Sequence, residues 1–553
     1  MSRIKTSIST PSGSKTSGLH FTLASDGSQY IRQLQGWERI FACWSAFGNG
    51  FSQIVFAFDV HFNIPLPEEQ LRVFIQAAWI KLRFHAPWIA CCSFSPDDGV
   101  PNTFYLSYSI SSKGKKDGES GPQASEIVEA WAQETIVWRH EKLSFRHWQA
   151  KIKETYWHPG SGHFGVELHI AKGQSDSNWF IMFCCCHALT DGRGLGPIAD
   201  LFFKFLHTEI EDHSPTTHRD LLWGTEIDRL ASTAVVVMPP PSRTLTMKNM
   251  MTNKLKFIRP PFPNRSRFLG GEETELSAII QLPHQQTQSL MNNCRAHKVK
   301  LTTVIVSIFV LADVAAILHF GKERLSQSQF AEMRHNYEKS EVYEAMSNAI
   351  DMRSRAHPRY NTSGGVISFR SPSYHDMSAI RKCIQIENKT IIGRNDPHAF
   401  WNYVVTDTHQ VLANIDRQSS NTFHLTSTHC EALSSSFTQL SDPGIRFSSL
   451  GSLKKLGFFI PFTPANRSCR SCLTITDTIA GMRMGDSQSI AVQFWEYNDS
   501  LMVNLQSSRR WQNPEAWDTL HTIFRQLLTE IALDQWPDVP RVLGESSNCS
   551  AKL

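Results

Sequence analysis

The sequence predicts an α/β (α+β) protein built from two domains, and three observations support this prediction. Alternating apolar residues at 52–62 and 164–171, and a continuous apolar run at 179–186, are typical of strands, the last one buried on both faces. Apolar residues at helical spacing lie between these strands, for example at 68–84. A chain of 553 residues is also long enough for two or more domains, and a proline-rich stretch at 238–268 divides it near the middle.

These patterns divide the chain into five segments. We expect a disordered tail at 1–29, a first domain at 30–237, a crossover at 238–268, a second domain at 269–540 and a tail at 541–553. The crossover holds Pro239-Pro240-Pro241 and Pro260-Pro261, and proline at this density favours an extended chain over a core helix. Its lysines are interpreted as part of a solvated linker, although they would also suit a phosphate-bearing cosubstrate.

The elements of the first half follow from apolar spacing and from turn residues. Pro65 and Pro67, followed by Glu68 and Glu69, predict the start of a helix, because proline and acidic residues are favoured at helix amino ends. In chain order we expect helix 31–47, strand 52–62, helix 68–84, strands 89–94 and 104–109, a loop at 111–125, helix 126–138, strand 164–171 paired with 179–186, and helix 195–207.

The second half shows the same mixture of patterns. Thr302 and Thr303 are expected to cap a strongly apolar helix that ends near His319. The other expected elements are strand 274–282, helix 284–297, a strand over 343–353, strands 473–478, 489–495 and 500–505, and an amphipathic helix at 517–533.

Composition argues against several classes of protein. The chain has 41% hydrophobic and 19% charged residues, which is typical of a soluble globular protein, and its net charge of +4 argues against a nucleic-acid binder. We expect no membrane span, because the apolar run 304–318 is interrupted by Asp313 and is shorter than the roughly 20 residues required. The twelve cysteines show no framework spacing and are expected to be reduced. The lone Cys469-Arg-Ser-Cys472 motif predicts no metal site.

The two ends of the chain bear on its location. The amino terminus has no apolar core and predicts no secretory signal, so we expect a cytoplasmic protein. The last three residues, Ala551-Lys552-Leu553, resemble the Ser-Lys-Leu peroxisomal address, which makes the peroxisome the alternative.

The candidate catalytic residue is His187, which follows directly after the buried run 179–186. A histidine there is held by a rigid strand yet can face a cavity, and near its usual pKa of about 6.5 it can accept a proton at neutral pH. Asp191 would accept a bond from a loop amide or pair with an arginine, and Gly192 allows a positive φ or a close approach. For a lone histidine, a buried structural role would be the alternative.

The string His187-Ala-Leu-Thr-Asp191-Gly192 resembles the H-x-x-x-D-G signature of the chloramphenicol-acetyltransferase-like superfamily. That superfamily includes plant BAHD acyltransferases, condensation domains of peptide synthetases and fungal O-acetyltransferases of secondary metabolism. The resemblance extends over about 30–535, and its length and texture are most similar to fungal enzymes that acetylate terpenoid toxins of the trichothecene type. It implies two similar domains, each a mixed sheet flanked by helices, with an active-site tunnel at their interface.

The resemblance also implies roles for other residues. Asp191 would be structural and would pair with an arginine, either Arg83, in the turn 83–87, or Arg353, in Asp351-Met352-Arg353. Gly364-Gly365 would bring backbone close to the substrate channel, although a hairpin pair explains these glycines equally well. Thr476 or Thr478 would supply a hydroxyl toward an oxyanion, although strand residues on a solvated face are the simpler interpretation. The D-F-G-W-G motif of plant members is absent from the sequence.

The expected activity is transfer of an acetyl group from acetyl-CoA, or of another acyl group from its acyl-CoA, to a hydroxyl of a fungal-type secondary metabolite, terpenoid or trichothecene-like. His187 would act as general base. The sequence has no G-x-S-x-G elbow, which argues against a covalent hydrolase. We expect no bound cofactor and no metal, two small-molecule substrates and a monomer. Two alternatives stay open: a condensation-like enzyme that uses a carrier-bound acyl thioester, and a non-catalytic relative that only binds a ligand.

Overall fold

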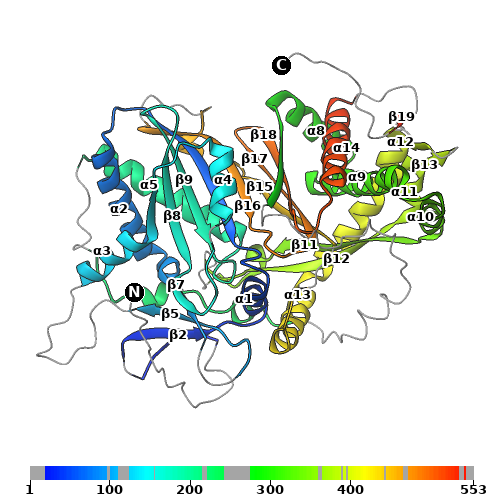
Figure 1. The fold of residues 1–553 in the computed structure, drawn as a ribbon. Helices are drawn as coiled ribbons and strands as arrows, with labels where there is room; N and C mark the ends of the chain where they lie inside the picture. Colours follow the sequence, from blue (N-terminus) through cyan, green and yellow to red (C-terminus); the bar gives the residue numbers. More distant parts are fainter. Residues whose placement is uncertain are drawn as a thin grey trace, which may run out of the picture.

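The structure is a computed structural model, in which two main sheets lie side by side, one for most of each half of the chain (Figure 1). It describes residues 19–25, 27–95, 100–109, 124–154, 156–213, 221–241, 275–358, 364–387, 390–393, 397–440, 444–464, 471–534 and 541–542. The predicted loop at 111–125, the crossover at 238–268 and the C-terminal tail, with Ala551-Lys552-Leu553, lie outside the described residues apart from a few positions at their ends.

The first main sheet is formed around the buried apolar run. Its strand order is β16-β3-β9-β8-β6, and all neighbours are antiparallel except β6 and β8. The predicted pairing of 164–171 with 179–186 is confirmed by the β8–β9 ladder. The strands are β3 Ile54–Phe62, β6 Ile136–Arg139, β8 Val166–Lys172, β9 Asn178–Cys185 and β16 Leu473–Met482.

Helices cover both faces of this sheet, which explains why β9 is apolar without alternation. Phe183 packs against Phe202 of α5, with ring centroids 5.6 Å apart. Phe180, on the opposite face, packs against Phe145 of α4 at 5.2 Å. These helices are α2 Glu68–His85, α4 Phe145–Glu154 and α5 Gly192–Glu211.

Strand β16 lies in the second half of the sequence but completes the first sheet. It pairs with β3 along its length, with Met482 opposite Ile54 and Leu473 opposite Phe62. Its other edge is bound by side chains of the second sheet: Tyr497 donates to the Ile475 carbonyl, and Asn504 and Gln506 bond the backbone of Ala480 and Met482. We call this contact the seam. The expected domains, 30–237 and 269–540, did not predict that a strand from the second segment belongs to the first sheet.

The second main sheet has the order β10-β18-β17-β15-β11-β12 and is mixed, with β11, β15 and β17 parallel. Its strands are β10 Glu275–Leu282, β11 Val342–Asp351, β12 Ser368–Asp376, β15 Gly444–Ser452, β17 Ser489–Tyr497 and β18 Ser500–Ser508. Its helices are α8 His284–Ala296, α9 Leu301–Arg324, α10 Gln327–Lys339, α11 Met377–Cys383, α13 Thr406–Ser435 and α14 Pro514–Leu533, beside a small sheet of β13 Ile384–Glu387, β14 Thr390–Gly393 and β19 Arg541–Val542.

Helix α9 is the core helix of the second half. It is long and apolar enough to cross a membrane, but 89% of its apolar stretch is buried inside the protein. Phe309 packs edge-on against Phe447 of β15, and the buried Asp313 accepts a hydrogen bond of 2.7 Å from the Tyr343 hydroxyl. Its apolar character is therefore explained by packing against the second sheet and α14.

Several predicted element boundaries were wrong. The expected helix 31–47 begins only at Trp37 (α1, Trp37–Phe47), because 29–33 pairs with β5 as strand β2. The expected tail 1–29 contains part of an ordered hairpin, and the third sheet comprises β1 Thr22–Leu23, β2 Gln29–Gln33, β4 Cys92–Phe94, β5 Tyr105–Ser109 and β7 Ser161–Phe164. The expected helix 126–138 ends at Thr135 (α3, Ala124–Thr135) and continues as β6.

The expected threonine caps of α9 were also wrong. Helix α9 begins after Lys300, and no side chain caps its first turn. Thr302 and Thr303 lie one and two residues inside the helix. Tertiary packing of the long apolar helix therefore fixes its start without a side-chain cap.

Candidate active site

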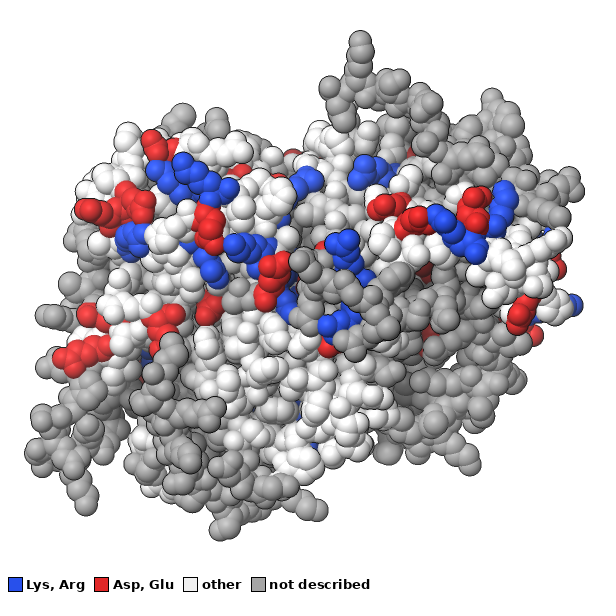
Figure 2. Space-filling view, in the orientation of Figure 1, with Lys and Arg blue, Asp and Glu red and all other residues white. Residues whose placement is uncertain are grey.

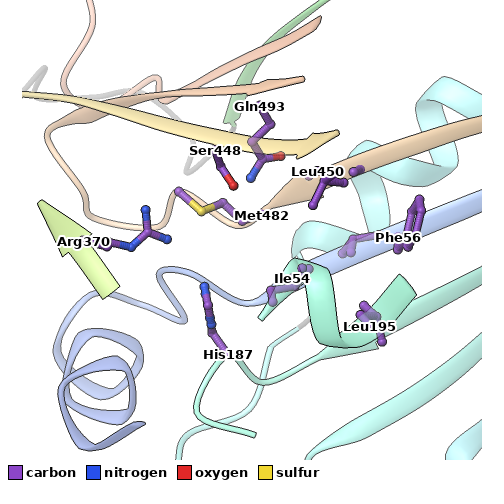
Figure 3. A pocket seen from close by; sticks show the side chains of 13 residues that line it. Ile54, Phe56, His187, Leu195, Arg370, Ser448, Leu450, Met482 and Gln493 are labelled. Carbon is purple, nitrogen blue, oxygen red and sulfur yellow. The ribbon is translucent and has the colours of Figure 1, made fainter. Parts of the chain in front are cut away.

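His187 lies in the loop between β9 and α5, with its ring directed into a pocket (Figure 3). The ring is 6% exposed and stacks on Phe41 of α1, with centroids 3.7 Å apart and an interplanar angle of 11°. Its Nδ1 lies 3.0 Å from the Thr190 carbonyl. Because a carbonyl only accepts hydrogen bonds, Nδ1 must carry the proton, which leaves Nε2 with a free lone pair.

The electrostatic surroundings keep this imidazole neutral. Burial, and then the nearby Arg370 cation, lower the pKa of His187 to about 4, while Asp191 acts in the opposite direction. At neutral pH the ring is therefore unprotonated and able to accept a proton.

Asp191 fixes the loop that carries His187. Its Oδ1 accepts hydrogen bonds from the backbone amides of Arg193 and Gly194, at 3.1 and 3.0 Å, and so caps α5. The same oxygen lies 2.8 Å from Arg353 Nη1, which comes from the second half of the chain. Burial alone would raise the pKa of Asp191, but Arg353 and these bonds hold it below its usual value. Asp191 is therefore a structural anion.

The structure distinguishes between the two candidate arginines. Arg353 also bonds Asp351, at 3.0 Å, so the expected Asp351-Met352-Arg353 turn meets the histidine loop. Arg83 does not pair with Asp191. Its guanidinium lies among aromatic rings, with Cζ 5.0 Å from the Trp131 ring and 5.6 Å from the Tyr108 ring. Arg83 belongs to the last turn of α2.

The structure does not bring the two candidate threonines to His187. On β16, Met482 lies at the Ile54 end, beside the histidine loop, and Thr478 is roughly 13 Å further along the strand at about 3.3 Å per residue. Thr478 Oγ1 accepts a hydrogen bond of 2.9 Å from Trp495, and Thr476 Oγ1 donates to the Asp59 carbonyl at 3.1 Å. Both hydroxyls form hydrogen bonds to residues of the two main sheets. Their positions do not support the expected oxyanion role.

The pocket in front of His187 has a cavity volume of about 40 Å³ and lies between the two main sheets. Its wall is mainly apolar, and four polar side chains enter it: His187, Arg370, Ser448 and Gln493 (Figure 3). The apolar part is contributed by Ile54, Val55, Phe56, Leu195, Leu450, Ala480 and Met482, beside Gly192 and Gly481. A concave, mainly apolar site with few polar groups is the usual form of a small-molecule site.

Three pocket residues, Arg370, Ser448 and Gln493, were not predicted from the sequence. Arg370 lies on β12, and Gln493 interrupts an otherwise apolar stretch of β17. A polar residue within an apolar strand is a signal for a site, but the sequence alone could not show that these strands face His187. Among the described residues no group of three or more His, Cys, Asp or Glu side chains could hold a metal ion.

Two glycines bring backbone close to this pocket. Gly192 begins α5, and a Cβ there would lie 2.8 Å from a methyl of Leu450, so the close approach explains this glycine. Gly365 has φ +81°, and its amide donates to the Leu189 carbonyl at 2.7 Å. Gly365 also forms a parallel bridge with Thr190. The backbone at Gly365 thus holds the Leu189–Thr190 segment, whose Thr190 carbonyl orients His187.

This contact gives a testable prediction. We expect Gly365→Ala to destabilise the protein by about 1 kcal/mol, because alanine is strained at positive φ, and also to slow catalysis by shifting the Thr190 carbonyl. Thermal unfolding and initial rates measure the two effects. The matched control is Gly457→Ala, which has φ +83° and nothing within 4 Å of the added Cβ. Equal activity of the two variants would contradict the proposed support.

A second, larger cavity is also bordered by β15. Its volume is about 280 Å³, and it lies between the β15–β17 strand ends and helices α8 and α9. Three basic residues line it, Arg295, Lys300 and Lys455, together with Ser449, Gly451, Ser452 and Trp495. Consecutive residues of β15 therefore border the two cavities, with Ser448 and Leu450 on the histidine side.

The two sheets, the shared strand and the histidine loop define a class of protein. The chain has the chloramphenicol-acetyltransferase-like and condensation-domain fold, as the H-x-x-x-D-G string predicted. It is similar in structure to TRI3 trichothecene 15-O-acetyltransferase from Fusarium sporotrichioides, with a TM-score of 0.69 and 14% identity over 93% of this chain and 98% of that one.

Two further solved structures share the fold. The first condensation domain of the calcium-dependent antibiotic synthetase has a TM-score of 0.53 and 12% identity, covering 92% of this chain and 98% of that one. The SgcC5 protein from Streptomyces globisporus has a TM-score of 0.51 and 11% identity, covering 92% and 100%. The sequence matches no protein-family model and no curated protein.

Proposed function

We propose that this protein is an O-acyltransferase that moves an acyl group from acyl-CoA to a hydroxyl of a small molecule. The observation that carries the proposal is the state of His187: a neutral ring whose Nδ1 is engaged by the Thr190 carbonyl and whose Nε2 faces a mainly apolar pocket. A base of this kind contributes roughly 10²-fold to 10⁴-fold in rate.

In the proposed reaction, Nε2 of His187 takes the proton of the acceptor hydroxyl as its oxygen attacks the thioester carbonyl. The C–O bond forms, and the carbonyl electron pair moves to oxygen, giving a tetrahedral oxyanion. That electron pair then restores the carbonyl as the C–S bond breaks, and the departing thiolate takes the proton from His187. Ser448 and Gln493 are the neutral hydrogen-bonding groups of the pocket that can donate to the oxyanion.

The larger cavity supports coenzyme A as the donor. Its three basic side chains suit phosphate groups, beside one carboxylate, Glu496, and β15 borders both this cavity and the His187 pocket. A pantetheine arm that passes Leu450 would bring its thioester in front of His187. Figure 2 shows positive and negative side chains interleaved among the described residues on the face in view, whereas docking of an acidic carrier protein would favour an extended basic face.

The acceptor is proposed to be a hydroxylated secondary metabolite, with terpenoids of the trichothecene type tested first because the wall of the pocket is largely apolar. The protein would act as a monomer in the cytoplasm, and the peroxisomal address at 551–553 stays a prediction.

The experiment is release of free thiol from acetyl-CoA in the presence of hydroxylated terpenoids, with the acylated product identified by mass. Thiol release that requires the acceptor and yields an ester supports the proposal. Turnover only with an acyl thioester on a carrier protein would favour the condensation-like alternative. Binding of acceptors without any turnover would favour the non-catalytic one.

The pKa of His187 gives a prediction for pH dependence. Because the neutral ring is the active form, we expect kcat/KM to stay constant down to about pH 5 and to fall only as pH passes below the folded pKa of about 4. An ordinary histidine would lose activity near pH 6.5. Between these values the unfolded state binds more protons at His187, so this group lowers stability as the pH falls. The pH profile should therefore be measured together with thermal unfolding at each pH, and an acidic limb near pH 6.5 would contradict the prediction.

A further inference from the structure

Arg370 is a cation that the proposed transfer step does not use. Its guanidinium enters the His187 pocket from β12, and its Nε is buried without a hydrogen-bond partner among the described residues. The described carboxylate that acts on it electrostatically, Asp191, is already bound to Arg353. Burial lowers the pKa of Arg370 to about 10, so it is still charged at neutral pH.

The neighbouring buried arginine is placed differently. Arg446 Nε donates to the Ser489 hydroxyl at 3.1 Å, and its guanidinium lies 4.6 Å from the Trp44 ring. Arg370 also lies near an aromatic ring, with Cζ 5.4 Å from the centroid of Phe41. Arg446 differs in having a side-chain hydrogen-bond partner and in not lining the pocket. Arg370 is the charge that the pocket offers to a ligand. A buried cation is costly unless an anion pairs with it.

The position of Arg370 indicates which substrate it meets. Arg370 lies on β12, which is an edge strand of the second sheet. The larger cavity is bordered by β15 and β17, which β11 separates from β12 in the strand order. Figure 3 shows Arg370 on one side of His187, with Leu450 and Leu195 on the other. The residues that lead to the larger cavity, Gly451 and Ser452, follow Leu450. If acyl-CoA enters on the Leu450 side of His187, Arg370 lies on the opposite side, where the acceptor would bind.

We infer that Arg370 binds a carboxylate of the acceptor, so that the acceptor class is an apolar hydroxy acid. The inference rests on the proposed function and narrows its acceptor from any hydroxylated metabolite to one that carries an anion. The planar guanidinium matches a carboxylate with two parallel hydrogen bonds. The apolar wall would hold the carbon skeleton while the hydroxyl meets Nε2 of His187.

The test compares acids with their methyl esters, which keep the hydroxyl and the skeleton but lose the charge. The probes are 3-hydroxybenzoate, 4-hydroxycyclohexanecarboxylate and 12-hydroxydodecanoate, each beside its ester. Binding is measured by calorimetry, and transfer by thiol release from acetyl-CoA. For at least one pair we expect the wild type to prefer the acid, and Arg370→Met to lower kcat/KM for that acid by about 100-fold while leaving the ester within about threefold.

Controls separate a specific loss from a folding defect. Arg334→Met removes an exposed arginine of α10, whose partner is Glu338, and should leave the preference unchanged. Arg370→Lys keeps the charge without the planar fork and should retain part of the preference. Thermal unfolding shows whether each variant is folded, and the ratio of acid to ester within one variant does not depend on how much of it is folded.

The outcomes decide between the two proposals. If no acid in the panel binds or reacts better than its ester, or if the preference survives in Arg370→Met, the inference about Arg370 is wrong, even if esters are acylated. If the acids bind through Arg370 but neither class of acceptor releases thiol, the carboxylate site stands and the acyl-CoA transferase proposal fails.

Discussion

Replacing His187 with alanine is expected to lower the rate of acyl transfer by about 10²-fold to 10⁴-fold. The variant loses the only group in the pocket wall that is placed as a neutral base, with its Nε2 free and its Nδ1 held by Thr190. The measurement is acceptor-dependent thiol release under single-turnover conditions, so that product release does not mask the chemical step.

The matched control for this variant is His335→Ala, which removes an exposed histidine from α10. It should keep full activity. Because His187 stacks on Phe41, its removal leaves a cavity, and thermal unfolding must show that the protein is still folded. Turnover that survives in folded His187→Ala would contradict the mechanism.

The second large effect is expected at the Asp191–Arg353 ion pair. Arg353→Met should lower the free energy of unfolding by about 3–5 kcal/mol, because it leaves the carboxylate of Asp191, whose side chain is 7% exposed, without its counter-ion. The measurement is denaturant unfolding with the slope compared between variants. Activity should fall as well, because the pair holds the loop between His187 and α5.

A double-mutant cycle isolates this pair from the helix cap. Asn is as good an N-cap as Asp, so Asp191→Asn removes the charge while keeping the bonds to the amides of Arg193 and Gly194. We expect the double variant to be more stable than the sum of the single losses implies, since neither charge is then left unpaired. Strictly additive losses would show that the 2.8 Å contact does not couple the two residues.

The local part of the site could be predicted from the sequence. The apolar run of β9 ends at Cys185, which places His187 after a buried strand, and Asp191 and Gly192 mark the loop and the start of α5. The same reasoning failed where partners come from distant elements. Residues 31–33 look helical beside Trp37, but pairing with β5 makes them part of strand β2.

The wall of the pocket could not be predicted, because it depends on how the two sheets meet. Thr478 and Met482 lie on one strand, and only the pairing of β16 with β3 decides that Met482 reaches the pocket and Thr478 does not. Gln493 is a polar residue between apolar neighbours on β17, whereas Arg370 lies on the largely polar β12, and only the fold shows that both face His187. Choosing Arg353 over Arg83 likewise required the fold, since both are arginines near turns.

The seam has a consequence for how the protein is made. Leu473–Met482 is synthesised more than 400 residues after Ile54–Phe62, its partner in the first sheet. During synthesis the β3 edge must therefore stay open while the whole second sheet up to β15 emerges, and an open apolar edge is prone to wrong pairing. Cutting the chain at the crossover would leave the first piece without β16 and the second piece with β16 unpaired by β3. They should be soluble and active only when they are produced together.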